Sequence, residues 1–183
     1  MKKVFVFIAE GFEETEAIAT IDVLRRGGLH VTTVSISEDY LVTGAHQITV
    51  LVDEKFSTTD FSDGELLVLP GGQPGADNLN SHIDLKRLIR QYYSAGKKIA
   101  AICAAPLVFG GLGLLNGKKA TAYPGYEDRL EGATVLEQPV VEDGQIITGR
   151  GPGFALQFGV ALVKALQGKK IADQVANGLL LNQ

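Results

Sequence analysis

Apolar residues along this chain fall into short continuous runs that alternate with longer stretches of helical spacing. The runs are β-branched or strongly apolar and end at charge, glycine or proline, and they span residues 3–9, 31–36, 65–70 and 98–102. Helical spacing occurs over residues 13–26, 83–93, 105–115, 154–167 and 170–177. Continuous apolar strands are typical of a parallel sheet that is covered on both faces. The alternation therefore predicts an α/β domain with a doubly wound sheet.

Two further stretches favour β-structure. Residues 46–52 are β-rich, and residues 140–148 carry Asp143-Gly144 between two short β-prone runs. An Asp-Gly pair in that position is a strong hairpin signal. We expect a β-hairpin added to the doubly wound sheet.

Length and charge limit the protein classes. The 183 residues are 45% apolar and show no linker or repeat, so we expect one domain over residues 1–183. The net charge is -4 and no long basic run is present, which argues against a nucleic-acid partner.

The cysteine count and the N-terminus bear on localisation. One cysteine, Cys103, cannot form an internal disulfide, which favours a reducing compartment. The apolar stretch 4–9 ends at Glu10 and is too short for a signal peptide. No stretch approaches the ~18 apolar residues of a transmembrane helix. We expect a cytoplasmic protein with no membrane partner.

The candidate chemistry lies directly after predicted parallel strands. Residues 10–16 follow the first strand, Gly71-Gly72 follow the strand at 65–70, and Cys103 follows the strand at 98–102. Ligands of doubly wound sheets bind at the carboxyl ends of the strands, so these segments should meet at one edge.

Cys103 occupies the turn between a buried strand and a predicted helix, which resembles a nucleophile elbow. The N-terminus of that helix should lower the thiol pKa below about 8.5. The alternative is a buried and inert cysteine, since free cysteine is among the most buried residue types. The backbone amides of Gly72 and Ala104 are candidates for an oxyanion hole, and the lack of side chains at Gly71 and Gly72 would let a substrate approach.

Four carboxylates, Glu10, Glu13, Glu14 and Glu16, fall within seven residues. Acids favour a helix N-terminus, which explains most of them. Crowding and burial raise carboxyl pKa values, so one of the four could stay protonated and move a proton to or from the thiol. Spacing does not choose between them. The three histidines lack metal-ligand spacing and no nucleotide motif is present, so we expect neither a metal nor another cofactor.

Taken together, four segments resemble the ThiJ/PfpI superfamily, and in particular its Parkinsonism-associated deglycase branch. They are GFEETEA (11–17), LPGGQPGADN (69–78), AAICAAP (100–106) and GRGPG (149–153). The resemblance implies a flavodoxin-like sandwich, similar to class I glutamine amidotransferases, that forms a homodimer. It places the acid partner of Cys103 at Glu16 and the oxyanion pocket at Gly71, Gly72 and Ala104. It also places Arg150 near the dimer contact and Asp22 in the partner subunit's site.

The sequence departs from the superfamily at three positions. Tyr123 stands where many relatives have a histidine near the cysteine, and Ala104 stands where the peptidase branch has one. His46 replaces an arginine near the pocket. Without a Cys-His pair, protease and amidotransferase activities are disfavoured.

The resemblance implies a cofactor-independent enzyme that acts on 2-oxoaldehydes, free or attached to protein side chains, as a glyoxalase or deglycase. Cys103 would form a hemithioacetal and Glu16 would move the proton, with Tyr123 at the substrate pocket. The alternative is a redox-sensing, stress-protective or chaperone-like protein that uses oxidation of Cys103. A structural module with an inert cysteine is the third hypothesis.

Overall fold

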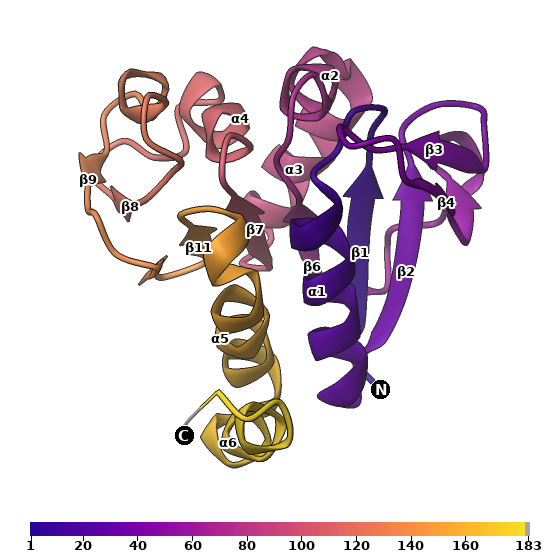
Figure 1. Cartoon of the computed structure of the whole chain (residues 1–183). Helices are drawn as coiled ribbons and strands as arrows, with labels where there is room; N and C mark the ends of the chain where they lie inside the picture. The colour runs from indigo at the N-terminus through magenta and orange to yellow at the C-terminus, as the bar shows by residue number, and fades with distance from the viewer. Residues whose placement is uncertain (182–183) are drawn as a thin grey trace.

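The computed structural model describes residues 1–181, whose central feature is a seven-stranded sheet with helices on both faces (Figure 1). The strand order is β10-β11-β7-β6-β1-β2-β5, and every neighbouring pair is parallel except β10–β11. The strands are β1 (Lys3–Ile8), β2 (His30–Ser35), β5 (Glu54–Lys55), β6 (Gly64–Leu69), β7 (Lys98–Ile102), β10 (Val140–Asp143) and β11 (Ile146–Gly149). This is the flavodoxin-like architecture that the sequence predicts.

The helices form the two outer layers. On one face lie α1 (Glu14–Arg26) and α5 (Ala155–Gln167), followed by α6 (Lys169–Gly178). The other face carries α2 (Gly75–Ser81), α3 (Ile83–Ser94) and α4 (Pro106–Gly111). Three short 3-10 helices occupy Phe56–Thr58, Glu127–Arg129 and Pro152–Phe154.

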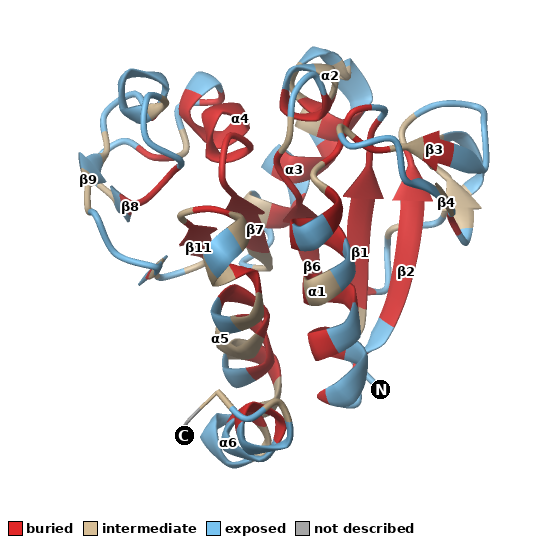
Figure 2. Cartoon of the chain, viewed as in Figure 1, coloured by how far each residue is buried: buried red, intermediate tan, exposed pale blue. Residues whose placement is uncertain are grey.

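Glycines allow α1 and α5 to lie close together. A Cβ at Gly159 would lie 2.8 Å from the Val23 side chain, and one at Gly27 would lie 2.7 Å from Val163. Between the helix layers, the strands are buried along most of their length, as Figure 2 shows for β1 and β2. The continuous apolar runs in the sequence are therefore explained by burial on both faces.

Several elements differ from the sequence expectation. The helix expected over 105–115 is the six-residue α4, because Gly113 takes a φ of +73° and the chain turns. The stretch 46–52 contributes only β4 (Thr49–Leu51), which pairs with β3 (Leu41–Thr43) outside the main sheet. A second small pair is formed by β8 (Lys119–Ala120) and β9 (Thr134–Val135).

The expected hairpin at 140–148 is confirmed, with Asp143 opposite Ile146 and Gly144 in the turn at a φ of +65°. It also extends the main sheet, because β11 pairs in parallel with β7. The hairpin is therefore the edge of the sheet and not an appendage to it.

The strand order reverses next to β1, which has β2 on one side and β6 on the other. In such sheets the ligand site lies at the carboxyl ends of the strands beside this point. Here the loops after β1 and β6 are joined by a hydrogen bond of 2.9 Å from the Glu13 amide to the Gly71 carbonyl. Among the described residues, no helix is long and apolar enough to cross a bilayer.

Candidate active site

Cys103 is the first residue after β7 and has a φ of +64°. A non-glycine residue in the left-handed region is uncommon and persists when its surroundings hold it there. The Cys103 amide donates to the Gly149 carbonyl at 2.9 Å, and the Cys103 carbonyl accepts from the Tyr123 amide at 2.9 Å. The cysteine is 8% exposed. Two neighbouring segments thus fix the backbone that aims the thiol.

Glu16 lies in the first turn of α1 and is fully buried. Its Oε2 accepts a hydrogen bond of 2.8 Å from the Gly71 amide. Its own amide donates to Oε2 of Glu13, the N-cap of α1, at 2.6 Å. The carboxyl is therefore tied to the loop after β6 while its backbone is tied to the start of the helix.

Gly71 brings the acid and the cysteine together. A Cβ at this position would lie 2.7 Å from Cys103 Cβ and 2.8 Å from Glu16 Oε2. Only the absence of a side chain leaves room for both groups. The three strand ends that the sequence analysis singled out do meet, with Glu16, Gly71 and Cys103 in one cluster.

Burial is the main influence on the Glu16 carboxyl. Removal from water raises its pKa to about 7, against the opposing effect of hydrogen bonds with Cys103 and the Gly71 amide. The charge of Glu13 raises it further. The carboxyl is therefore poised to gain or lose a proton near neutral pH.

Burial also raises the pKa of the Cys103 thiol, and the negative charge and hydrogen bonding of Glu16 raise it further. Amides of Gly72 and Ala104 act in the opposite direction. The expectation of a lowered Cys103 pKa is therefore wrong when Glu16 is ionised. The expectation rests on a helix N-terminus beside the sulfur, whereas α4 has only six residues and begins three residues beyond the cysteine. Glu16 and Cys103 form a coupled pair that competes for a proton.

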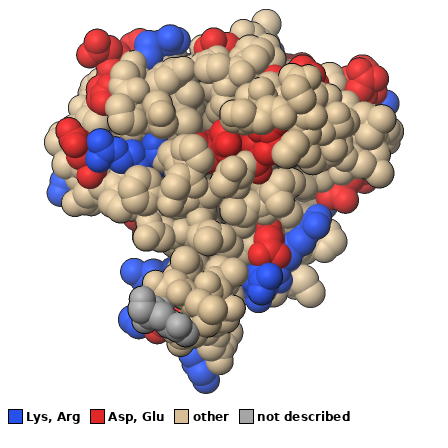
Figure 3. All heavy atoms as spheres, viewed as in Figure 1, with Lys and Arg blue, Asp and Glu red and all other residues tan. Residues whose placement is uncertain are grey.

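The other acids of the 10–16 segment have separate structural partners. Glu10 Oε2 accepts from the Thr43 amide at 3.0 Å. Glu14 is buried and accepts from the His46 amide at 2.6 Å and from His46 Nδ1 at 2.9 Å. Figure 3 shows acidic side chains gathered on the surface over the start of α1. Among the four carboxylates, Glu16 is the one placed beside the cysteine.

Glu13, Glu14 and His46 have ligand-type atoms within 4.8 Å of one another. Burial raises the Glu14 pKa, but hydrogen bonds from His46 and Ile48 outweigh this and leave it below its usual value. The hydrogen bond with Glu14 in turn raises the His46 pKa. The Glu14 oxygens are thus already used to anchor the loop 44–48 to α1.

Tyr123 contacts the site through its backbone. Its side chain is 46% exposed, and a Cβ at Gly151 would lie 3.1 Å from its ring. Arg150 follows β11 and donates from Nη1 to the Glu137 carbonyl at 2.9 Å. Asp22 lies six residues beyond Glu16 on α1 and accepts from Arg26 Nε at 2.6 Å. The side-chain hydrogen bonds of Arg150 and Asp22 are thus made with Glu137 and Arg26.

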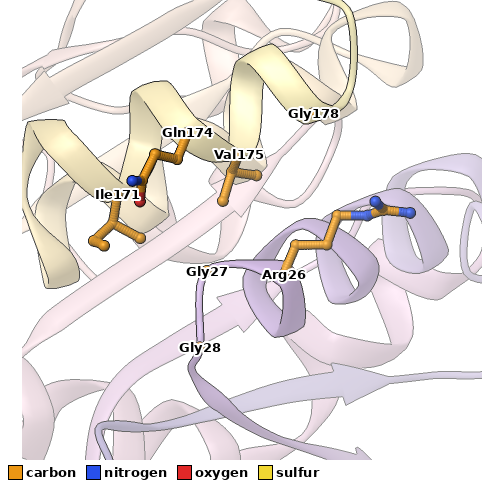
Figure 4. Close-up of a pocket in the computed structure, with 7 residues that line it drawn as sticks. All are labelled: Arg26, Gly27, Gly28, Ile171, Gln174, Val175 and Gly178. Carbon is orange, nitrogen blue, oxygen red and sulfur yellow. The ribbon is translucent and has the colours of Figure 1, made fainter.

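A hollow of about 370 Å³ lies at the opposite edge of the sheet, where α1 ends (Figure 4). It is lined by Arg26, Gly27, Gly28, Ile171, Gln174, Val175 and Gly178. It contains none of the candidate site residues, so it is separate from the site around Cys103.

Sequence reasoning missed two positioning groups. Glu13 was one of four equivalent acids, yet it caps α1 and holds the Glu16 amide. The Gly149 carbonyl fixes the Cys103 backbone. The helix N-cap position was the available signal for Glu13, whereas no sequence pattern predicts the Gly149 contact.

The fold and the site define a class: flavodoxin-like domains with a cysteine at a strand-to-helix turn beside a buried carboxyl. Residues 2–165 match the DJ-1/PfpI family. The chain belongs to that family.

Named relatives agree with this assignment. The chain is 43% identical over 183 residues to Protein DJ-1 homolog A of Arabidopsis thaliana, covering 98% of this chain and 47% of that protein. It therefore spans less than half of that relative's length. It is 36% identical over 182 residues to Protein dj-1beta of Drosophila melanogaster, covering 98% of this chain and 97% of that protein.

Solved structures share the fold. Oxidized DJ-1 of Toxoplasma gondii superposes with a TM-score of 0.94 at 34% identity, covering 98% of each chain. A cysteine-to-alanine mutant of a DJ-1 superfamily protein from Salmonella typhimurium gives 0.93 at 34% identity, covering 98% of each chain.

Proposed function

We propose that this protein is a cofactor-independent glyoxalase or deglycase that acts on 2-oxoaldehydes. The observation that carries the proposal is the buried Glu16 carboxyl, which lies beside the only cysteine of the sequence. The pKa of this carboxyl is raised to about 7. A general acid-base group works best when its pKa is near the working pH.

The chemistry can be written on methylglyoxal. Glu16 accepts the thiol proton as the Cys103 sulfur attacks the aldehyde carbon, which gives a hemithioacetal. The Gly72 and Ala104 amides, which already act on the sulfur, stabilise the oxyanion. Glu16 returns its proton to the oxyanion, which gives the neutral hemithioacetal, and then removes the proton from the former aldehyde carbon. The hydroxyl proton passes to the former ketone oxygen, and Glu16 protonates the neighbouring carbon, which gives a lactoyl thioester and leaves Glu16 ionised. Water cleaves the thioester and releases lactate and the free thiol.

Trapping of the intermediate tests this scheme. Protein quenched in acid during turnover should gain the mass of one methylglyoxal, because the hemithioacetal and the thioester share that mass. Glu16→Gln should form less adduct, because the thiol has lost its proton acceptor, and Cys103→Ala should form none. An adduct of equal yield in Cys103→Ala would place the chemistry on another residue.

A second candidate, a redox sensor, is favoured by the same amides and carboxyl. Two equivalents of peroxide convert a thiolate to a sulfinate and release two waters, and Glu16 and the amides could hydrogen-bond the sulfinate. The solved structure of Toxoplasma gondii DJ-1 is of the oxidized protein. Intact mass after mild peroxide should rise by two oxygens and stop. Unlimited oxidation, or none, would count against a sensor.

A homodimer is the proposed assembly. Apolar side chains lie exposed on β3–β4, in the loop that joins these strands and on the neighbouring α1: Leu41 at 62%, Leu51 at 74%, Ile48 at 56% and Ile18 at 48%. Leu41 and Leu51 face each other across the two strands. An exposed apolar patch of this kind is typical of an interface. Asp22 lies on the same helix as Ile18, consistent with a contribution to the partner's site. We also propose a cytoplasmic location.

A further inference from the structure

Two buried oxygens on α1 lack a hydrogen-bond partner among the described residues: Oε1 of Glu16 and Oγ1 of Thr20. Glu16 is 0% exposed and Thr20 is 1% exposed. Buried polar groups in folded proteins nearly always have a partner, which is often an internal water. Two such oxygens on one helix call for a shared explanation.

Helical geometry brings them together. Residues 16 and 20 are four apart within α1, so they share a face, and their Cβ atoms should lie about 5–6 Å apart. Side-chain oxygens carried by neighbouring positions of this kind are within reach of one bridging water molecule. The other oxygen of Glu16 is already bound by the Gly71 amide, so Oε1 is the atom free to accept.

We propose that Thr20 is a positioning residue that hydrogen-bonds the Glu16 carboxyl through one buried water molecule and so favours its proton-accepting form. The inference deepens the proposed function, because it rests on Glu16 as the group that takes the proton from Cys103. Thr20 itself does not touch the substrate.

The charges that act on Glu16 come from two other places. Cys103, after β7, and Glu13, before α1, are the titratable groups whose interactions reach its carboxyl. Thr20 carries no charge, so it acts only through the hydrogen bond. Donation to a carboxylate favours the ionised form, in opposition to burial. Loss of the hydroxyl should therefore make Glu16 harder to ionise.

Infrared titration tests the proposal without any substrate. The protonated Glu16 carboxyl is identified as the carbonyl band that Glu16→Gln removes, and its midpoint is followed against pH. Thr20→Val, which keeps nearly the same shape, should raise the midpoint by about one unit, a tenfold change in ionisation. Thr20→Ser keeps the hydroxyl and should restore the wild-type midpoint. An unchanged midpoint in Thr20→Val, or an equal shift in Thr20→Ser, would overturn the proposal.

A second measurement does not depend on the variants. A high-resolution crystal structure of the wild-type protein should show a water between Thr20 Oγ1 and Glu16 Oε1, and its absence would overturn the proposal. Both readouts are independent of turnover. A protein that fails to convert 2-oxoaldehydes but shows the shift and the water would refute the proposed function and leave the role of Thr20 intact.

Discussion

The Gly71 amide donates a hydrogen bond of 2.8 Å to Glu16 Oε2, and the space where a Gly71 side chain would project is filled by Glu16 and Cys103. The loop after β6 therefore sets the relative position of the acid and the thiol. Any atom added to Gly71 must move one of the two.

Gly71→Ala should disrupt the pair. Its Cβ would lie 2.7 Å from Cys103 Cβ and 2.9 Å from the Ile102 carbonyl, and overpacking of this kind costs about 1–3 kcal/mol. Urea unfolding should show that loss, with slower alkylation of Cys103. Gly178→Ala is the matched control, because a Cβ there meets nothing within 4 Å. Equal behaviour of the two variants would refute the close contact.

The buried Glu16 should make stability depend on pH. Its folded pKa of about 7 lies above the ordinary 4.5, so its stabilising contribution is complete below pH 4.5 and is lost as pH rises through 7. The shift corresponds to about 3 kcal/mol. Relative to wild type, Glu16→Gln should therefore gain stability at pH 8 and gain little at pH 4.5. Thermal unfolding at both pH values checks this, with the exposed Glu131→Gln as the control. A gain that does not change with pH would contradict it.

The sequence was sufficient for the fold class and for the edge of the sheet that carries the site. Buried strands in this sheet are continuous apolar runs, and the residues that follow them must share an edge. It was not sufficient for α2, whose Gly75, Asp77, Asn78 and Asn80 are weak helix formers. Tertiary hydrogen bonds hold α2 in place. The Gly75 amide donates to the Gly11 carbonyl at 3.1 Å, and Asn78 Nδ2 donates to the Glu10 carbonyl at 2.9 Å.

The choice of Glu16 among four acids required either the family resemblance or the folded chain. Spacing along the sequence does not distinguish Glu13 from Glu16, since both lie on one helical face. Only the packing of α1 against the loop after β6 buries Glu16 and leaves Glu13 as the cap. The prediction of a lowered Cys103 pKa was wrong for the same reason, because the burial of the thiol and the nearby carboxyl both result from tertiary structure.

The proton acceptor should be visible in the reactivity of Cys103. In the wild type, the rate at which iodoacetamide alkylates Cys103 should change with pH around 7, where Glu16 changes charge. Glu16→Gln should lose this pH dependence. Tyr123→Phe should keep this pH dependence, because Tyr123 donates from its backbone amide to the Cys103 carbonyl and its side chain is 46% exposed. If Tyr123→Phe removed the pH dependence and Glu16→Gln did not, the two roles would have to be exchanged.

The exposed leucines of β3–β4 should support the dimer. Leu51→Lys places a charge on the apolar patch, and because Leu51 is 74% exposed the monomer fold should tolerate it. Light scattering should give twice the 19.5 kDa chain mass for the wild type and the chain mass for the variant. Ile83→Lys, 72% exposed on α3, is the control that should stay dimeric. A wild-type monomer would rule out the interface.

Lactate formation from methylglyoxal tests the central claim most directly. Proton NMR should show lactate accumulating with the wild-type protein and no lactate above background with Cys103→Ala. Glu16→Gln should be slower by about 10²–10⁴, the usual contribution of a general acid-base group. Tyr123→Phe should stay within a few-fold of the wild type. Wild-type protein that forms no more lactate than Cys103→Ala would contradict the assignment of Cys103 and Glu16 as a glyoxalase pair.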